Sequence, residues 1–228
     1  MKKKIIIACS KDWFLKNLKV KNFIKNKNVI LITKKKNLNL SFIDKIKPNI
    51  IFFPHWSFKV NPDILKRYIC ICFHTAPLPF GRGGSPIQNL IIKNFKKSPV
   101  CAIKMTNDID AGPIYLKRII SLSGTLDQIF ERISLRVIEM IKILVIKKIN
   151  PKKQIGKVYK FKRIKEKNSE IKNEKNITEI FNKIRMLNAD DYPSAYIKIK
   201  NIKLFLSNPV LKKNTIFCNA KIFRFKNQ

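Results

Sequence analysis

Short apolar runs alternate with amphipathic segments over the first 150 residues, and this alternation constrains the fold more than any other feature. The runs are rich in Ile, Val, Phe and Cys and lie at 4–9, 29–33, 49–54, 68–73, 99–105 and 114–120. Helical spacing or helix-start residues lie between or after them, at 12–25, 41–46, from Pro62, from Ser85-Pro86 and at 125–147. Continuously apolar strands separated by helices are typical of a mostly parallel sheet covered on both faces, so we expect an α/β fold.

The remaining third of the chain differs in composition. Residues 151–175 are rich in lysine and polar residues after a short strand at 158–161, so we expect a linker there. A helix at 177–187 and strands at 195–200, 202–206 and 215–225 predict a small β-rich unit. The expected division is therefore 1–150, 151–175 and 176–228.

The formal net charge of +35 favours anionic partners such as folate tails, nucleotide diphosphates or RNA. Only 8 of the 49 basic residues are Arg, the residue that makes bidentate contacts to phosphate or guanine. The lysines are spread along the chain and accompany abundant Ile and Asn. We interpret most of the charge as compositional bias and leave open a functional share.

Five scattered cysteines and two histidines limit the kinds of disulfide and metal site that the chain can form. An odd number of cysteines in apolar runs indicates a reducing, cytoplasmic setting rather than a disulfide framework. Two histidines give no zinc-ligand spacing, so no metal is expected. The apolar stretch after Lys2-Lys3-Lys4 ends by Lys11, too early for a signal peptide, and we expect no membrane association.

A loop within residues 72–89 is the strongest candidate for a site. It holds His74 and concentrates three of only six glycines, at positions 81, 83 and 84, among Pro77, Pro79 and Pro86. Proline stiffens a loop, and glycine lets its backbone approach a ligand. A buried turn with His74 bonded to a carbonyl is the structural alternative.

A second element lies at 107–113, where Asp110 and Gly112 follow another predicted strand. A carboxylate there could orient the His74 imidazole and raise its basicity. No Gly-x-Gly-x-x-Gly fingerprint follows the first strand, so a nicotinamide enzyme is weakly supported.

Together these two elements resemble the folate-dependent formyltransferases, which include methionyl-tRNA and nucleotide-sugar enzymes. The matching residues are His74, Leu78-Pro79, Arg82-Gly83, Pro86-Ile87 and Asp110-Ala-Gly112. The resemblance is strong over about 70–150 and weaker over 1–69. The segment at 184–197 is similar to the start of the small C-terminal domain of the tRNA and sugar enzymes. The resemblance implies a Rossmann-like formyltransferase domain at 1–150, with the small β-rich unit after it.

Its implied chemistry is transfer of a formyl group from 10-formyltetrahydrofolate, a co-substrate, to a primary amine without a metal. His74 would take the amine proton or donate to the developing oxyanion, and Asp110 would fix the imidazole. Cofactor contacts would come from Leu78, Pro79, Phe80, Gly81, Arg82 and Gly83, with Trp56 flanking the folate at the end of the third strand. An aromatic cap on the core is the other interpretation of Trp56.

One position departs from the family pattern. Cys72 stands two residues before His74, where the family usually has an Asn that donates to the oxyanion. A thiol is a weak donor. The chain is therefore either a catalytically degenerate folate-binding protein or, as we expect, an enzyme in which His74 or a backbone N–H makes that contact.

The acceptor is the least determined feature. The style of the two motifs and the short C-terminal segment favour a nucleotide-linked amino sugar. Methionyl-tRNA is the alternative, favoured by the charge. The sequence does not indicate an oligomeric state.

Overall fold

A computed structural model describes residues 3–20, 23, 26–190 and 192–225. The chain divides into two compact units. The first takes its described residues from Met1–Arg82, Ser98–Ile120 and Phe130–Lys160, and the second takes its residues from Gly83–Lys97, Ser121–Ile129 and Phe161–Gln228. These units do not divide at residues 150 and 175, because segments far apart in sequence pack within each of them.

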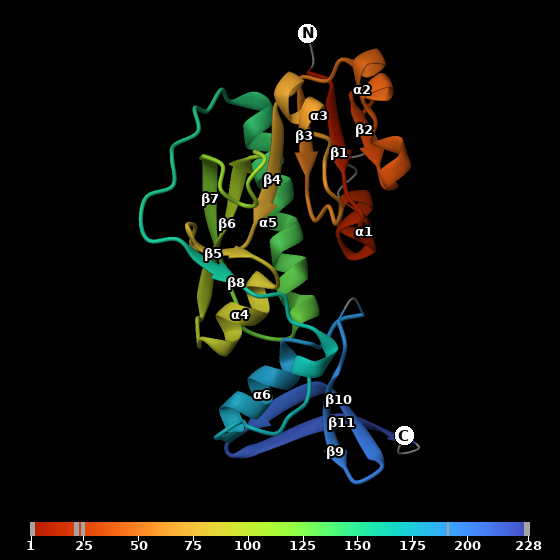
Figure 1. Ribbon diagram of the computed structural model, residues 1–228, viewed down its shortest axis with the longest axis vertical. Coiled ribbons are helices and arrows are strands. Elements are labelled where there is room, and N and C mark those ends of the chain that lie inside the picture. Colours follow the sequence, from red (N-terminus) through yellow and green to blue (C-terminus); the bar gives the residue numbers. More distant parts are fainter. Residues whose placement is uncertain (1–2, 21–22, 24–25, 191, 226–228) are drawn as a thin grey trace. The chain divides into compact units, whose positions relative to one another are not determined.

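Six strands of the described chain form the central sheet, in the order β2-β1-β3-β4-β6-β7 (Figure 1). Their bounds are β1 Ile5–Ala8, β2 Val29–Ile32, β3 Ile50–Phe53, β4 Cys70–His74, β6 Lys97–Lys104 and β7 Ile114–Ser121. Strands β2, β1, β3 and β4 are parallel. Every residue of β1 and β3 is buried, as the unbroken apolar runs predict for a sheet covered on both faces.

Strand β6 runs antiparallel to β4, with His74 opposite Cys101. The mostly parallel α/β sheet is therefore confirmed, and the reversal of β6 is a feature that the apolar pattern did not contain. An apolar run buries equally well in either direction, so direction depends on the connection and not on the run.

Helices connect these strands, with bounds α1 Asp12–Val20, α2 Leu40–Ile46, α3 Pro62–Arg67, α4 Pro86–Ile92 and α5 Leu126–Ile146. A one-turn helix, η2, lies at Lys35–Asn37. Asn39 and Asn61 cap α2 and α3, because their side chains accept the N–H groups of Phe42 and Asp63, both at 2.9 Å. Four of the positions expected in the first helix, 21–22 and 24–25, lie outside the described residues.

Two local expectations were wrong. Ser85 precedes α4 but has φ of 48° and no side-chain capping bond; its hydroxyl oxygen instead accepts the N–H of Ile164 at 3.1 Å. The segment expected as an open loop contains β5, Phe80–Gly83, which pairs with β8, Tyr159–Phe161. The pairing satisfies backbone groups that a bare loop would leave to solvent.

The second unit contains α4, α6 and a three-stranded sheet of order β11-β10-β9. Its further elements are η3 Glu166–Asn168, α6 Ile177–Arg185, β9 Ala195–Ile199, β10 Ile202–Lys212 and β11 Thr215–Arg224. The small β-rich unit is thus confirmed. Part of the expected linker belongs to it, because Ser169 is buried and Ile171 donates to the Tyr196 carbonyl at 2.8 Å.

Arg185 is the main buried charge of the second unit. Its Nη1 donates to the carbonyls of Leu122 at 2.7 Å and Gly124 at 2.9 Å, and its Nε donates to Asn182 Oδ1 at 2.8 Å. Only 6% of the residue is exposed. A guanidinium that satisfies three acceptors attaches the end of α6 to the turn before α5.

Replacing Arg185 by Met should lower the free energy of unfolding by about 2–4 kcal/mol, because three acceptors, two of them on buried residues, lose their donor. Chemical denaturation followed by circular dichroism measures the change. The exposed Arg224→Met on β11 is the matched control and should stay within about 0.5 kcal/mol of the wild type. Equal losses in the two variants would contradict the structural role of Arg185.

Candidate active site

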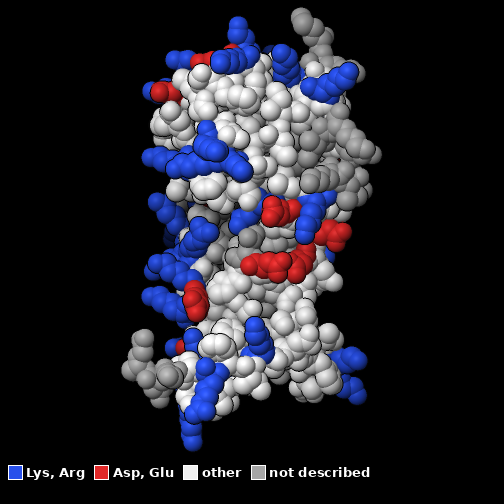
Figure 2. Space-filling view, turned by 90° about the vertical axis from the view of Figure 1, so that its right-hand side faces the viewer, with Lys and Arg blue, Asp and Glu red and all other residues white. Residues whose placement is uncertain are grey.

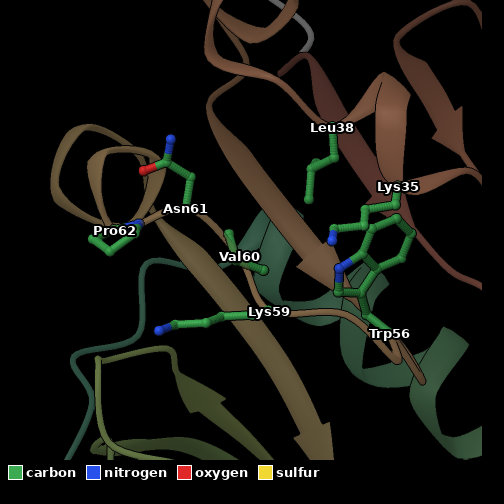
Figure 3. A pocket seen from close by; sticks show the side chains of 7 residues that line it. All are labelled: Lys35, Leu38, Trp56, Lys59, Val60, Asn61 and Pro62. Carbon is green, nitrogen blue, oxygen red and sulfur yellow. The ribbon is translucent and has the colours of Figure 1, made fainter.

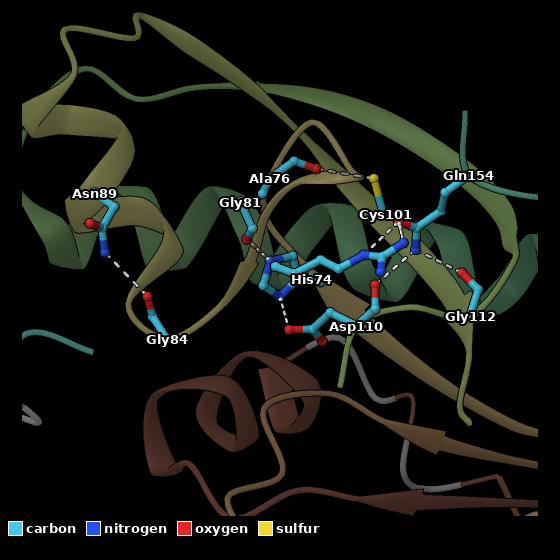
Figure 4. A network of polar contacts seen from close by, with 10 residues as sticks. His74, Ala76, Gly81, Gly84, Asn89, Cys101, Asp110, Gly112 and Gln154 are labelled. Atoms are coloured by element: carbon cyan, nitrogen blue, oxygen red, sulfur yellow. Dashed lines mark hydrogen bonds and ion pairs between the residues drawn. The ribbon is translucent and has the colours of Figure 1, made fainter. Parts of the chain in front are cut away.

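His74 ends strand β4 and is held at both ring nitrogens (Figure 4). Nε2 lies 2.7 Å from the carbonyl oxygen of Gly81, and Nδ1 lies 3.3 Å from Asp110 Oδ2. Only 7% of His74 is exposed. The two sequence elements expected to form the site are therefore joined by direct contacts.

These contacts place the protons of the imidazole. The Gly81 carbonyl can only accept a hydrogen bond, so Nε2 carries a hydrogen and donates it. The neutral ring is then the Nε2–H tautomer. A further proton would sit on Nδ1, where the Asp110 carboxylate faces it. The pair can hold a positive charge on the imidazole and direct one N–H toward the Gly81 side.

Asp110 lies in a constrained turn. Its φ is 53°, a left-handed conformation that Asp and Asn tolerate better than other non-glycine residues. Two residues later, a Cβ on Gly112 would fall on the carbonyl oxygen of Lys104, so the close approach of the chain there requires glycine. The turn thereby presents the carboxylate to His74 from a fixed backbone.

Gln154 connects the two elements, and the sequence patterns did not indicate it. Its Oε1 accepts from Arg82 Nη2 at 2.8 Å and Nε at 3.1 Å. Its Nε2 donates to the carbonyls of Asp110 and Gly112, both at 2.8 Å (Figure 4). One side-chain amide thus uses both its donor and its acceptor ends to hold the Asp110 turn beside the arginine of the glycine-rich loop. Gln154 belongs to no motif and lies 44 residues from Asp110, so only the structure reveals it.

The glycine-rich loop is rigid by packing as well as by composition. Leu78 is buried against Cys101, Ile103 and Ile114. The Leu78–Pro79 peptide is cis, and Phe80 stacks on Tyr159 at 5.0 Å.

Glycine is needed at different positions of the loop for different structural reasons. Gly81 and Gly83 have φ of 88° and 99°. A Cβ on Gly83 would lie 2.8 Å from the Phe161 carbonyl oxygen, so β8 leaves no room for a side chain there. Gly81 supplies the carbonyl that His74 meets, whereas the side chain of Arg82 is bound to Gln154.

Cys72 lies on β4 opposite Ile103 and Phe53, and packs between two apolar clusters. Burial raises the pKa of its thiol well above the ordinary range, followed by the influence of the Asp110 charge. Cys72 therefore stays a neutral thiol, unsuited to act as a nucleophile or general base.

Trp56 does not share a lining with the glycine-rich loop. It lines a hollow with residues from 35–38 and 59–62, and its ring packs edge-on against Phe53 and Phe58. None of residues 78–83, expected beside it in the folate site, lines that hollow. The folate contact expected for Trp56 stays a prediction without a structural contact to support it.

His55 directly precedes Trp56 after β3. Its ring packs against Trp13 at 4.4 Å and Phe14 at 5.7 Å, and Trp13 stacks on Phe130 at 4.3 Å. Burial lowers the pKa of His55 to about 3, with smaller contributions from the charges of Lys11 and His74. His55 is thus neutral at ordinary pH and part of an aromatic cluster.

Metal-binding groups and membrane-spanning helices are the other features considered for the described residues. Among the residues that the structure describes, no group of three or more His, Cys, Asp or Glu side chains could hold a metal ion. In the same part of the chain, no helix combines the length and apolar character needed to cross a membrane.

The mixed sheet and the His74–Asp110 pair agree with the formyltransferase class that the sequence resembles. Comparison with known proteins supports this class directly. Residues 166–223 match the family described as "Methionyl-tRNA formyltransferase, C-terminal domain". A methionyl-tRNA formyltransferase of Rickettsia massiliae is 32% identical over 209 residues, covering 82% of this chain and 68% of that protein.

A solved structure from Clostridium thermocellum, named methionyl-tRNA formyltransferase, is 39% identical with a TM-score of 0.92. The alignment covers 98% of this chain and 100% of the C. thermocellum chain. The chain therefore belongs to the formyltransferase family, and these relatives within it are methionyl-tRNA formyltransferases.

More distant structures share the fold alone. HypX from Aquifex aeolicus in complex with tetrahydrofolic acid is 16% identical, with a TM-score of 0.75 over 92% of this chain and 38% of that one. A 4-N formyltransferase from Francisella tularensis is 18% identical, with a TM-score of 0.68 over 92% and 98% of the two chains. The fold therefore extends beyond the proteins named methionyl-tRNA formyltransferase.

Two variants separate the functions of Gln154. Gln154→Leu should lower formyl transfer about tenfold to hundredfold, because a released turn misplaces Asp110. Gln154→Glu can still accept from Arg82 but sets a carboxylate against two carbonyls, so it should be similarly impaired. Turnover is measured alongside thermal unfolding. Near-normal turnover in the Glu variant would show that only the Arg82 contact matters.

The His55 cluster should make stability depend on acid. The folded pKa of about 3 lies below the ordinary 6.5, so the unfolded chain binds the proton first as pH falls. The stabilisation is complete above pH 6.5 and declines toward pH 3, by up to about 2 kcal/mol at pH 5. His55→Asn suits the φ of 54° and does not titrate. Denaturation at pH 5 and 7 should show a shallower dependence in the variant; parallel profiles would refute the assignment.

Proposed function

We propose that this chain transfers the formyl group of 10-formyltetrahydrofolate to the amino group of methionyl-tRNA. The observation that carries the acceptor is the match of residues 166–223 to the C-terminal domain of methionyl-tRNA formyltransferase. The observation that carries the chemistry is the contact between His74 and Asp110. The R. massiliae alignment spans about two thirds of that relative, and other curated relatives align over smaller shares.

His74 is the proposed hydrogen-bond donor to the reacting formyl group. The amine attacks the formyl carbon, the bond from that carbon to the folate nitrogen breaks, and the proton lost by the amine ends on that nitrogen. Negative charge develops on the formyl oxygen meanwhile. Nε2–H, held by the Gly81 carbonyl in the free chain, would turn to donate to this oxygen. The change needs no proton transfer to or from His74, because the same N–H donates first to the Gly81 carbonyl and then to the formyl oxygen.

Asp110 supports this role from the other side of the ring. Its carboxylate faces Nδ1 and stabilises positive charge on the imidazole while proton positions change. Cys72 fills space beside the site as a neutral thiol, so the oxyanion donor would be His74 or a backbone N–H rather than the side chain at position 72.

The glycine-rich loop is the proposed folate contact. Leu78 and Pro79 form its apolar part, Phe80 contributes an aromatic ring, and Gly81 to Gly83 bring backbone close to the ligand. Family membership supports the folate, as does the tetrahydrofolic acid bound to HypX, which shares this fold. The bonded guanidinium of Arg82 makes it a support for the loop in this arrangement.

Charge supports an RNA acceptor. Lysine and arginine side chains occur at many separate places on the face in Figure 2, with a smaller acidic group. In the second unit, Lys198 and Lys203 lie over the Phe225 ring at 5.0 and 5.6 Å, and Lys212 lies over Phe217 at 5.8 Å. Aromatic rings interleaved with lysines suit a strand of nucleotides. The sequence left open whether part of the positive charge is functional, and we assign that part to tRNA binding.

The amino-sugar acceptor, which the motif style favoured, is the less supported reading. The two relatives above 30% identity described above are methionyl-tRNA enzymes, whereas a solved sugar N-formyltransferase from Shewanella is 16% identical. The residues of one loop reflect the formyl-transfer chemistry that the family shares, whereas we expect other parts of the surface to select the acceptor. A cytoplasmic location remains a prediction from the cysteines.

The test is a formylation panel. Methionyl-tRNA and a set of nucleotide-linked amino sugars are incubated with 10-formyltetrahydrofolate, and mass spectrometry detects the gain of a formyl group. Formylation of methionyl-tRNA that falls steeply with added salt is expected, since phosphate contacts release counterions. Formylation of a sugar alone would overturn the acceptor and keep the reaction. No transfer to any amine would favour a folate-binding protein.

Asp110→Asn is the sharpest variant for the mechanism, because Asn also tolerates the left-handed backbone. It should lower turnover about 10²- to 10⁴-fold, the range of a general acid–base group, while folate binding persists. Single-turnover transfer and equilibrium folate binding separate the two effects. Asp108→Asn, in the same turn but outside the pair, is the matched control and should retain turnover.

A further inference from the structure

A second hollow lies outside the His74 site and has its own chemistry (Figure 3). Its volume is about 380 Å³, within the ~300–1,000 Å³ of small-molecule sites. The lining residues are Lys35, Leu38, Trp56, Lys59, Val60, Asn61 and Pro62. Leu38, Val60 and Pro62 supply apolar walls, and Trp56 supplies an aromatic one.

The polar groups of this hollow are almost entirely donors. The indole Nε1–H of Trp56 is buried and has no hydrogen-bond partner among the residues that the structure describes. Lys35 and Lys59 each bring an ammonium group, and Figure 3 shows the Lys35 nitrogen ending near the indole nitrogen in that view. Asn61 uses its oxygen to cap α3, which leaves its amide N–H groups. No acidic residue lines the hollow.

A buried donor without an acceptor costs free energy unless a ligand or water supplies one. A lining of donors, two positive charges and an aromatic wall therefore suits a ligand with acceptor atoms, a planar ring and an anionic group. Ammonium groups at the rim would bind the anion as point charges, and the indole would contact the ring.

The position of the hollow favours the same class of ligand. Its residues follow the carboxyl ends of β2 and β3, the two strands that flank β1 in the parallel part of the sheet. The chain passes from β1 to β2 on one side and then crosses to β3 on the other. Such a reversal of strand order opens a crevice at the carboxyl edge, where α/β sheets bind ligands such as nucleotides.

We propose that this hollow binds a nucleoside 5′-phosphate unit, either a free nucleotide or one nucleotide of an RNA strand. Trp56 contacts the base, and its Nε1–H donates to an acceptor on the ligand. Lys35 and Lys59 bind the phosphate. This inference goes beyond the proposed formyl transfer, since none of its residues belongs to the His74 site.

The test measures binding to the full chain by titration calorimetry. The probes are adenosine 5′-monophosphate, a single-stranded RNA trinucleotide, inorganic phosphate and 5-formyltetrahydrofolate. The mononucleotide or the trinucleotide should bind, and the tighter of the two identifies the source. Lys35→Met and Lys59→Met should each weaken that binding about tenfold. Trp56→Phe keeps a ring but removes the N–H, and should weaken it about threefold to tenfold.

Lys45→Met is the matched control, since Lys45 is exposed on α2 outside the hollow and its loss changes net charge equally. It should stay within about twofold of the wild type. Thermal unfolding checks that all variants are folded. Nucleotide binding that is absent, or equal in all variants, overturns the proposal. Loss of only 5-formyltetrahydrofolate binding would also overturn it, assigning the hollow to the folate. Formylation of methionyl-tRNA is read separately, so either proposal can fail alone.

Discussion

His74 sits between two acceptors that the backbone holds in place, and the arrangement of the site depends on this constraint. The Gly81 carbonyl fixes Nε2–H on one side, and the Asp110 carboxylate faces Nδ1 on the other. A histidine whose Nε2–H is committed to a carbonyl has one neutral tautomer, and contacts on both sides of the ring fix its orientation. The remaining features of the site serve to bring these two acceptors to the end of β4.

Gln154 explains how two loops separated in sequence act as one. It accepts from Arg82 and donates to the carbonyls of Asp110 and Gly112, so the loop that holds the first acceptor is tied to the turn that holds the second. A buried polar network in which each member has partners is rigid, and rigidity is what a preorganised donor requires. The neutral thiol of Cys72 packs against apolar side chains and is not one of these partners.

We assign specificity for the acceptor to other parts of the molecule. The proposed formyl transfer uses the His74 loop and the Asp110 turn, and a methionyl-tRNA formyltransferase and a sugar N-formyltransferase share the fold. The second unit carries the C-terminal match and the lysine–aromatic contacts, and the hollow at Trp56 offers donors for a phosphate and a base. Each of these features suits a polynucleotide, and each can be tested without the others.

The sequence by itself determined the α/β class, the order along the chain of the six strands of the central sheet, and the pairing of His74 with Asp110. Apolar runs bury wherever a core forms, and scarce glycine and histidine mark a loop by composition alone. Only the tertiary structure decided that β6 reverses, that 80–83 is a strand paired with β8, that Ser85 accepts from Ile164, and that Trp56 faces a separate hollow. Gln154 was invisible in the sequence, and the bonds of Arg185, a residue of the 184–197 segment, were not predicted, although each side chain binds three polar groups or more. Their partners are backbone carbonyls and side chains brought near by packing, and a carbonyl has no residue type by which a pattern could find it.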